Sequence, residues 1–244
     1  SDGQMLFMLN GVSKLKSTGK MAIIQNGSPL FSGNAGSGES EIRRYLIEND
    51  WVDAIIQLST DTFYNTGITT YIWIITKNKP AHREGKVQLI DASNMVVLRR
   101  KAIGNKRYDI TDECRNFIVK AYGEFENRIY TLGDKVCESK LIDNIDLGYN
   151  KITIETPLYD ENGNIVLKGK KPVVDPSKRD TENVPLTEDI DAYFETEVKP
   201  YNKDAFVDKS KTKIGYEIPF TKYFYKYVAP EKSEDITARI FTLE

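Results

Sequence analysis

MAIIQNGSPLFSGNAGSGESEIRRYLIENDWVDAIIQL, residues 21–58, contains the pattern that decides the fold. It begins with a short apolar run, Met21–Ile24, and ends with a second one, Val52–Leu58, and each predicts a buried strand. Between them, residues 39–49 have apolar side chains at helical spacing. A strand, a helix and a strand over this distance predict a right-handed crossover that joins two parallel strands.

The glycine-rich loop GNAGSGES, Gly33–Ser40, matches the phosphate-binding pattern G-x-x-x-x-G-K-[ST] except that Glu39 replaces the lysine. Glu39 and Glu41 fall in the first turn of the predicted helix, where carboxylates are favourable and would repel a polyphosphate. The loop therefore predicts a capped helix start, with Ser37 or Gly38 as the N-cap, and disfavours a nucleotide triphosphate site.

Two further strands are expected downstream. Ile68–Thr76, ITTYIWIIT, is rich in β-branched and aromatic residues, and Lys86–Ser93 is a second candidate. The connection before Ile68 is too short for a crossover helix, so that strand should run antiparallel to a neighbour. The first 95 residues thus predict half of an α/β sheet, with two parallel strands followed by an antiparallel hairpin.

The rest of the chain is of mixed character. A helix is predicted over residues 4–16, and others over Thr111–Phe125 and Asp189–Val198. The turn DENGN, residues 160–164, predicts a hairpin, and residues 173–190 predict a surface excursion. Because the sequence changes in texture after Val97, we expect two regions, 1–96 and 97–244.

Composition excludes several kinds of chemistry. The 34 basic and 36 acidic residues give a net charge of −2, which argues against a polybasic coat. His82 is the only histidine and lies in a polar turn, so catalysis by a Ser-His-Asp or Cys-His group and nearly all histidine metal sites are disfavoured. Cys114 and Cys137 are expected to be reduced thiols of a cytoplasmic protein. The sequence has no signal-peptide pattern and no apolar run long enough to span a membrane.

The segment FYNTGI, Phe63–Ile68, is a candidate site with two interpretations. It can be a hairpin turn in which Gly67 adopts a positive φ and the aromatic rings cap the core. It can also be a platform that stacks a flat ligand such as a nucleobase, worth about 1–3 kcal/mol. The residues alone favour the first.

Basic residues gather between positions 77 and 107. Nine of them against Glu84 and Asp91 give this stretch a net charge of +7 (9 − 2) in an acidic chain. This is either a contact surface for a phosphate backbone or a solvated face. The nine are Lys77, Lys79, Arg83, Lys86, Arg99, Arg100, Lys101, Lys106 and Arg107.

Residues 19–79, from GKMAIIQNGSPLF to TGITTYIWIITKNK, resemble the methylation (M) subunit of type I restriction–modification systems. The resemblance continues through GKVQLIDAS, GYNKITIETPL, VPLTEDIDAYF and KTKIGYEIPFTKYFYKY, and so covers essentially the whole chain. It implies an adenine-N6 DNA methyltransferase that uses S-adenosylmethionine (AdoMet).

The resemblance also implies a fold and a site. The fold would be the C-terminal half of a class I AdoMet methyltransferase (Rossmann-like) sheet with a terminal antiparallel hairpin, followed by a mixed α+β region. Phe63 and Tyr64, with Asn65, would lie against a target base flipped out of DNA, which reverses the preference stated above. Phe63 is the first choice for the stacking ring, and the Asn26–Pro29 loop would lie on the same rim.

Two motifs of such enzymes are missing from these 244 residues. No two of the nine prolines are adjacent, so Asn-Pro-Pro is absent, and no glycine-rich loop follows a first strand. We therefore expect a C-terminal portion of the M subunit that is inactive alone and does not bind AdoMet tightly, with AdoMet as the cofactor of the full-length subunit. The expected partners are double-stranded DNA, a specificity subunit and a restriction subunit.

A second hypothesis is a non-catalytic module for assembly or DNA binding that docks the specificity subunit. It would use the aromatic residues near the C-terminus, namely Tyr216, Phe220, Tyr223, Phe224, Tyr225 and Tyr227.

Overall fold

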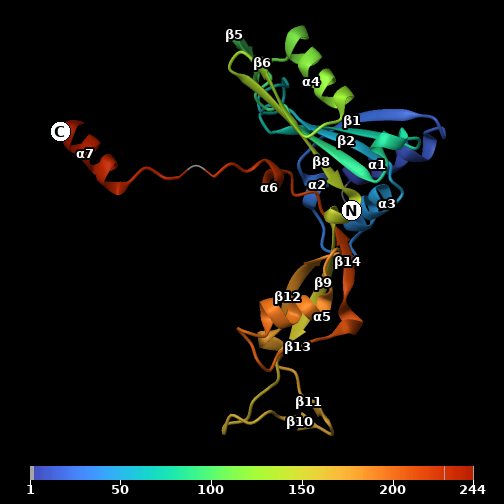
Figure 1. Cartoon of the computed structure of the whole chain (residues 1–244), viewed down its shortest axis with the longest axis vertical. Helices are drawn as coiled ribbons and strands as arrows, with labels where there is room; N and C mark the ends of the chain where they lie inside the picture. Colours follow the sequence, from blue (N-terminus) through green and yellow to red (C-terminus); the bar gives the residue numbers. More distant parts are fainter. Residues whose placement is uncertain (1–2, 228, 244) are drawn as a thin grey trace.

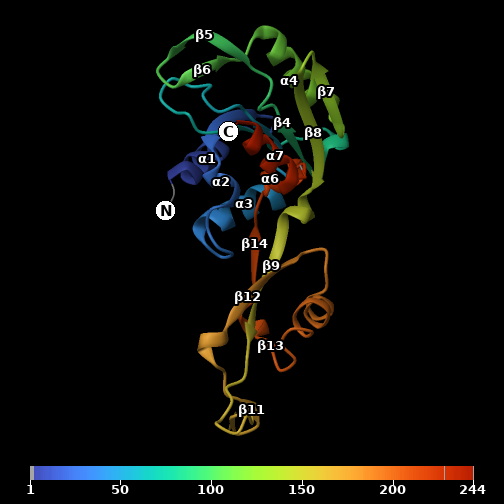
Figure 2. The same ribbon diagram turned by 90° about the vertical axis from the view of Figure 1, so that its left-hand side faces the viewer.

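The computed structural model describes residues 3–227 and 229–243, which form a sheet-and-helix body, a long arm and a C-terminal segment (Figure 1; Figure 2). The body lies at one end of the molecule and the arm projects from it. The C-terminal segment leaves the body and ends in helix α7, which stands apart in Figure 1.

The strands of the body are β1 (Lys20–Asn26), β2 (Val52–Gln57), β3 (Thr70–Thr76), β4 (Lys86–Asp91), β5 (Val97–Ile103), β6 (Lys106–Asp109), β7 (Arg128–Leu132) and β8 (Lys135–Asp143). Those of the arm are β9 (Gly148–Glu155), β10 (Leu167–Lys168), β11 (Lys171–Pro172), β12 (Asp180–Pro185), β13 (Phe206–Val207) and β14 (Lys213–Tyr216).

The α-helices are α1 (Gly3–Lys14), α2 (Ser28–Phe31), α3 (Gly38–Glu48), α4 (Asp112–Glu124), α5 (Ile190–Tyr193), α6 (Phe220–Phe224) and α7 (Ser233–Leu243). Short 3₁₀ turns are η1 (Ala81–Arg83), η2 (Asn144–Leu147), η3 (Pro176–Lys178) and η5 (Lys209–Lys211), and η4 (Phe194–Val198) is a π-helical turn that continues α5.

The main sheet has six strands in the order β1-β3-β2-β4-β8-β7. Strand β3 lies between β1 and β2 and runs antiparallel to both, which confirms the antiparallel direction expected for Ile68–Thr76. β1 and β2 therefore point the same way without pairing. The hairpin expected at the end of this region is wrong, because β4 pairs in parallel with β2 and not with β3.

The expected strand at Met21–Ile24 is present, but the prediction that it is buried is wrong. β1 is an edge strand whose burial alternates, and Ile24 is 50% exposed. β2 occupies the interior of the sheet and its first five residues are all buried, as predicted. The apolar runs looked alike because an edge strand can still carry consecutive apolar residues when one face packs on the core.

The boundary expected after residue 96 does not coincide with a break in the sheet. β8 pairs with β4 over Lys86–Asp91, and β7 pairs with β8, so residues up to 143 belong to the same body. The change of texture after Val97 reflects the exposed β5–β6 ribbon, most of whose residues face solvent.

Helices cover both faces of the sheet. Met5, Met8 and Val12 of α1, together with Leu46 of α3, join the core on one side of the fully buried Trp73. On the other side α4 packs onto β2, β4 and β8, and the cluster there includes Ile118. The N-cap of α3 is Ser37, whose hydroxyl accepts from the Ser40 amide at 3.4 Å. This confirms that the glycine-rich loop opens a helix.

The arm is built around β9, which pairs antiparallel with β12, β13 and β14. One face of this small sheet is apolar and packs Ile152, Ile154 and Val184 against Phe194. All of β12 lies inside residues 173–190, so the expected surface excursion contains a regular strand, and most of the residues in this stretch are exposed or partly exposed. The DENGN hairpin is confirmed, since Tyr159 and Ile165 form an antiparallel bridge across the turn.

The C-terminal aromatic residues do not act as one group. Tyr216 and Phe220 are buried in the core of the body, and the Phe220 ring lies edge-on to Tyr71 with centroids 5.3 Å apart. Tyr225 and Tyr227 are 68% and 73% exposed. The first two are therefore corrected from partner contacts to core residues.

The two thiols, Cys114 and Cys137, are free and buried in the cluster beneath α4. Burial raises the pKa of Cys137 to about 12, which keeps that thiol protonated. His82 is exposed, as expected. In the described part of the chain, no helix has the length and apolar character needed to cross a membrane, and no group of metal-ligand side chains gathers.

Candidate functional site

The carboxyl ends of β1 and β2 meet at one edge of the sheet. Asn26 at the end of β1 pairs with Thr70 of β3, and the Leu58 amide after β2 donates to the Thr70 carbonyl at 2.8 Å. Asn26 and the FYNTG turn, which follows Leu58, therefore lie along the same edge. Ligands of open α/β sheets bind at this edge, beyond the carboxyl ends of the strands.

The two rings of the turn point to different environments. Phe63 is half-buried and packs onto the cluster between α4 and the sheet, whereas Tyr64 is 55% exposed and Asn65 is also exposed. The positive φ expected at Gly67 is wrong, because Asp61 adopts the left-handed conformation instead, with φ 53°. A Cβ at Gly67 would lie 2.7 Å from the Asp61 carboxylate, so close approach is what requires glycine there.

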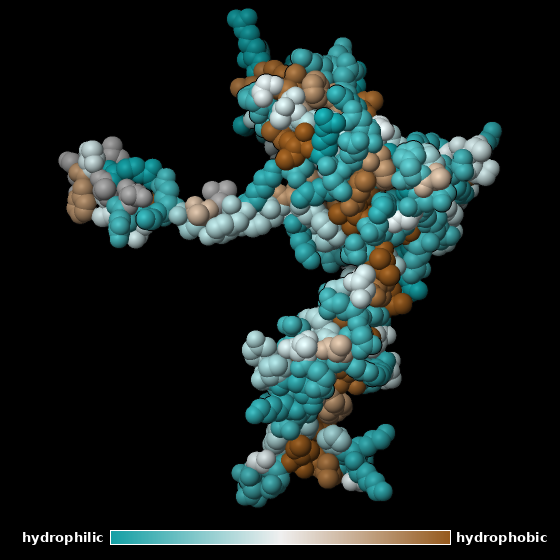
Figure 3. Space-filling view, in the orientation of Figure 1, coloured by the Kyte–Doolittle hydropathy of each residue, from teal (hydrophilic) through white to brown (hydrophobic). Residues whose placement is uncertain are grey.

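A cavity of about 560 Å³ opens behind this turn. Its walls are mostly apolar, and Lys106, Asp109 and Arg115 are its ionisable residues. In Figure 3 apolar surface gathers at this upper end of the body. The lining residues come from β1, β2, β3, the turn, β6 and α4: Ile24, Ile56, Leu58, Thr62, Phe63, Tyr64, Ile72, Ile74, Lys106, Asp109, Ile110, Arg115, Ile118 and Val119. Its size and lining suit a flat, mostly apolar ring.

The β5–β6 ribbon is fastened to the aromatic turn by backbone hydrogen bonds. The Asn105 amide donates to the Tyr64 carbonyl at 2.9 Å, and the Arg107 amide donates to the Asp61 carbonyl at 2.9 Å. Gly104 at the ribbon tip has φ +58°, and a Cβ there would lie 2.6 Å from the Tyr64 carbonyl oxygen. The Lys106 ammonium lies 5.2 Å from the Tyr64 ring centroid. The ribbon and the turn thus form one continuous surface.

Five of the predicted phosphate-contact residues lie on this ribbon. Arg100 and Lys101 are exposed, and in the described part of the chain neither forms an ion pair. Arg99 and Lys106 pair with Asp109 at 2.5 and 3.1 Å. Arg107 is 4.0 Å from Asp61 with a side chain 68% exposed. The ribbon therefore carries exposed and partly compensated positive charge.

The remaining predicted contacts are engaged inside the body. Lys77 donates to the Leu15 carbonyl at 3.1 Å and lies over the Trp51 ring. Lys79 is buried, lies 2.5 Å from an Asp50 oxygen and donates to the Lys86 carbonyl at 2.6 Å. Burial lowers the pKa of Lys79, partly offset by its bond to Asp50. A buried, paired ammonium offers little to a phosphate, so Lys79 is poorly placed for the predicted backbone contact.

Arg83 is poorly placed for a phosphate contact for the same reason, because it too is buried and paired. Its side chain is 5% exposed, its Nε lies 2.6 Å from the fully buried Asp53 carboxylate, and it also bonds Gln88 at 2.9 Å. Tyr122 of α4 donates to Asp53, and Lys20 of β1 approaches the same carboxylate at 3.2 Å. Burial alone would raise the pKa of Asp53, but the hydrogen bonds from Tyr122 and Arg83 outweigh it, so the pKa is lowered. This network attaches α4 to the sheet.

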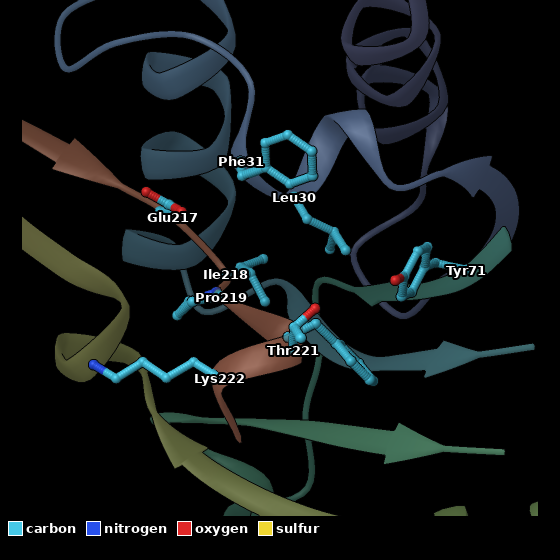
Figure 4. A pocket seen from close by; sticks show the side chains of 9 residues that line it. Leu30, Phe31, Tyr71, Glu217, Ile218, Pro219, Thr221 and Lys222 are labelled. Carbon is cyan, nitrogen blue, oxygen red and sulfur yellow. The ribbon is translucent and has the colours of Figure 1, made fainter. Parts of the chain in front are cut away.

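A second, smaller hollow of about 240 Å³ lies near Asn26 (Figure 4). Leu30, Phe31 and Tyr71 of the body line it together with Glu217–Lys222 of the C-terminal segment. The Ile218 amide donates to the Leu30 carbonyl at 2.8 Å, so this segment is fixed over α2. The Asn26 side chain accepts from the Ser28 amide at 3.0 Å and so helps to shape the same turn.

The ribbon–turn contact could not be found from sequence. The hydrogen bonds join residues about forty positions apart, and the only local signal was the basic composition itself. The Asp53 network had one local signal, a carboxylate within a strand predicted to be buried, which needs a partner. Its partners could not be found from sequence, because Arg83 and Tyr122 lie 30 and 69 positions away.

The cavity beside Phe63 does not fit AdoMet. The donor carries a positive sulfonium, yet the cavity beside Phe63 holds Lys106 and Arg115, and its acid, Asp109, is already paired with Arg99 and Lys106. The Asn-Pro-Pro motif is absent from these residues. We therefore derive no catalytic step through AdoMet from this chain.

Comparison with known proteins identifies the family of the chain. Residues 1–162 match the family model described as N-6 DNA Methylase. The MjaIX methylase subunit, a type I restriction enzyme subunit of Methanocaldococcus jannaschii, is 32% identical over 133 residues, which are 52% of this chain and 23% of that protein. The MjaVIII methylase subunit of the same organism is 31% identical over 140 residues, covering 57% and 22%.

One solved structure shares both sequence and fold. The methyltransferase subunit of a type I restriction-modification system from Streptococcus thermophilus is 30% identical with a TM-score of 0.50, and the match covers 60% of this chain and 28% of that one. The chain spans less than a quarter of the length of the two curated relatives.

Proposed function

Because the chain belongs to the N-6 DNA Methylase family, we propose that it is part of the M subunit of a type I restriction–modification enzyme, and that this subunit transfers a methyl group from AdoMet to adenine N6 in DNA. The family match and the named relatives support this assignment. In the assembled enzyme the subunit works with a specificity subunit, a restriction subunit and double-stranded DNA.

The observation that carries the proposal is the position of Phe63. Its ring lines a mostly apolar cavity of about 560 Å³ at the carboxyl edge of the sheet, and Tyr64 lies at the rim. An enzyme that modifies a base within duplex DNA must take the base out of the stack and hold it in such a pocket. Phe63 would stack on the flipped adenine, with Asn26 and Asn65 as polar contacts on the same edge.

The chain's own part in the reaction is to bind and orient the base. Stacking on Phe63 fixes the plane of the base, and the apolar strands behind it exclude water from its face. AdoMet supplies the methyl group when it is bound to the full-length subunit. Since these 244 residues lack the Asn-Pro-Pro motif, we expect them to transfer no methyl group alone.

The exposed cations of the β5–β6 ribbon would hold the DNA strand from which the base is extruded. Lys106 lines the cavity, and Arg99, Arg100, Lys101 and Arg107 lie on the same ribbon, where their charge would attract the backbone phosphates without reading sequence. Anchoring the flanking backbone there would keep the extruded base over the Phe63 ring.

The test is single-turnover methylation by the full-length subunit assembled with its specificity subunit. We expect Phe63→Ala to lower the rate about 5- to 150-fold, the equivalent of about 1–3 kcal/mol of stacking, while Phe63→Trp keeps much of it. Tyr201→Ala, which removes an exposed ring on the arm, is the matched control. Unchanged rates for Phe63→Ala would remove this residue from the target-base role. Methyl incorporation by the purified 244-residue chain would contradict its expected inactivity.

The alternative is a non-catalytic module that docks the specificity subunit, and the exposed rings of Tyr225 and Tyr227 favour it. Exposed aromatic residues are common anchors of protein interfaces. In that case Tyr225→Ala/Tyr227→Ala should lower the affinity of the labelled chain for the specificity subunit, measured by titration. The methylation measurement on Phe63 should not change. Equal affinity would leave the docking role without support.

A further inference from the structure

A third hollow, of about 440 Å³, lies where the arm meets the body. The glycine-rich loop forms one wall with Asn34 and the buried Ala35, and the polar face of the arm sheet forms the other. The arm contributes only lysines and hydroxyl-bearing residues, namely Lys151, Thr153, Thr181, Ser210, Lys211 and Lys213. Its lining is therefore cationic and rich in hydrogen-bond donors.

Two of these lysines oppose each other directly. Lys151 of β9 and Lys213 of β14 are paired in the antiparallel register, so their side chains leave the same face of the sheet. Like charges placed directly opposite each other are destabilising. Lys151 donates to the Asn34 side chain at 3.3 Å, and among the described residues neither lysine has an ion-pair partner. An arrangement that costs stability in the free protein is well suited to an anion that both lysines can share.

The neighbouring cations are already compensated. Lys211 lies 2.7 Å from the buried Glu155 carboxylate and 2.9 Å from Asp208, and Arg179 lies 2.9 Å from Glu155. These four cations (Lys151, Arg179, Lys211 and Lys213) and two carboxylates leave a charge of +2 (4 − 2) on this face, in a chain with a net charge of −2. The excess positive charge belongs to Lys151 and Lys213.

The glycine-rich loop is shaped to admit the Lys213 side chain. Gly36 has φ +80°, and a Cβ there would lie 3.1 Å from Lys213 Cδ and 3.7 Å from its Nζ. The loop's own acids do not line the hollow. The loop lacks the lysine of a phosphate-binding loop, yet two strands about 115 and 175 residues later place lysines beside it.

We propose that this hollow binds a phosphate of a nucleic-acid backbone, held by Lys151 and Lys213 and by the hydroxyl group of Thr181. The inference rests on the proposed function for its choice of DNA as the partner, and it adds a contact on the arm far from the Phe63 cavity in sequence. Bound there, the duplex would bridge the arm and the body.

The test is the salt dependence of binding of the 244-residue chain to a fluorescein-labelled 20-base-pair duplex, followed by anisotropy. Each lost phosphate contact lowers the slope of log K against log salt concentration by about 0.9. We expect Lys151→Gln/Lys213→Gln to lower it by about 0.9 to 1.8 units, and Lys151→Arg/Lys213→Arg to keep it. Lys16→Gln is the control, because Lys16 is an exposed lysine that precedes β1, whereas the glycine-rich loop follows that strand. Thermal melting verifies the fold of each variant. Because Lys151→Gln/Lys213→Gln relieves the repulsion between the two lysines, it should not lower the melting temperature.

Pyrophosphate as a competitor separates a backbone phosphate from a free one. The backbone contact is supported if Lys151→Gln/Lys213→Gln lowers the slope of log K against log salt concentration. Pyrophosphate should then displace the duplex no better than expected from its ionic strength. An unchanged slope in Lys151→Gln/Lys213→Gln overturns the proposal. This holds even if that variant loses the binding of pyrophosphate, because the site would then bind a free phosphate only. Absence of duplex binding by the wild-type chain at 50 mM salt also overturns it. Neither result bears on Phe63, because methylation by the full-length subunit is measured separately.

Discussion

Residues 77–86 and residues 99–107 carry basic side chains at similar density, yet the two regions use their charge in opposite ways. In the first, Lys79 and Arg83 are buried and neutralised by Asp50 and Asp53. In the second, Arg100 and Lys101 face solvent on a two-stranded ribbon. The comparison teaches that a net charge of +7 over a stretch locates no surface by itself, because burial decides which cations a partner can reach.

The buried region can be broken by removing its anion. Asp53→Ala should lower the free energy of unfolding by about 3–5 kcal/mol, because Arg83 would remain buried without a counter-charge. The measurement is urea denaturation followed by circular dichroism. Asp109→Ala, which removes the carboxylate of the exposed ribbon, should leave the urea midpoint nearly unchanged. Equal losses in the two variants would show that the Asp53 network is no more important than a surface pair.

The exposed region can be broken without unfolding. Arg100→Gln/Lys101→Gln should reduce the slope of log K for duplex DNA against log salt by about 1.8, so that roughly tenfold less affinity is lost between 50 and 200 mM salt. Lys79→Gln should reduce stability and leave that slope unchanged. A slope change in Lys79→Gln with an intact fold would return Lys79 to the contact surface.

The attachment of the ribbon to the turn can be sharpened at one residue. Gly104→Ala places a Cβ 2.6 Å from the Tyr64 carbonyl oxygen at a positive φ, and should cost more stability than the about 1 kcal/mol that the positive φ alone costs. Gly133→Ala is the matched control, because Gly133 also has a positive φ but open space around it. Amide hydrogen exchange should become faster at Asn105 and Arg107 in Gly104→Ala alone.

The smallest expected effect is a change with pH. Since the pKa of Asp53 is lowered in the folded state, its ionised form contributes stability above the unfolded value of about 3.9. That contribution is lost as the pH falls from about 4 through the folded pKa. In Asp53→Asn, acid should therefore remove less stability between pH 5 and pH 2 than in the wild-type chain. Parallel curves for the two proteins would contradict the role of Asp53.

Much of the fold could be predicted from local pattern. The helix over residues 39–49, its Ser37 cap and the buried run Val52–Leu58 follow from periodicity and capping, which depend on neighbours in sequence. The direction of β3 was also predictable, because a short connection forces an antiparallel neighbour. The pairing of β4 with β2 was not, since partner choice depends on strands that are distant in the chain.

For the candidate site, sequence resemblance selected the FYNTG turn but not its surroundings. The half-burial of Phe63, the exposure of Tyr64 and the cavity between them depend on α4 and the β5–β6 ribbon. Likewise, the aromatic cluster near the C-terminus divides into the core residue Phe220 and the exposed Tyr225 because only the first meets Tyr71.

By itself the sequence determined where α3 begins and that β2 and β3 are strands, because these depend on side chains a few positions apart. Family resemblance, and not local pattern, selected the FYNTG turn as the one that could meet a base. Only the tertiary structure decided which lysines and arginines are available, since desolvation and ion pairing join residues tens of positions away. It also decided that Lys151 and Lys213 stand opposite each other beside the glycine-rich loop. Register between distant strands fixes that juxtaposition, and no local pattern encodes it.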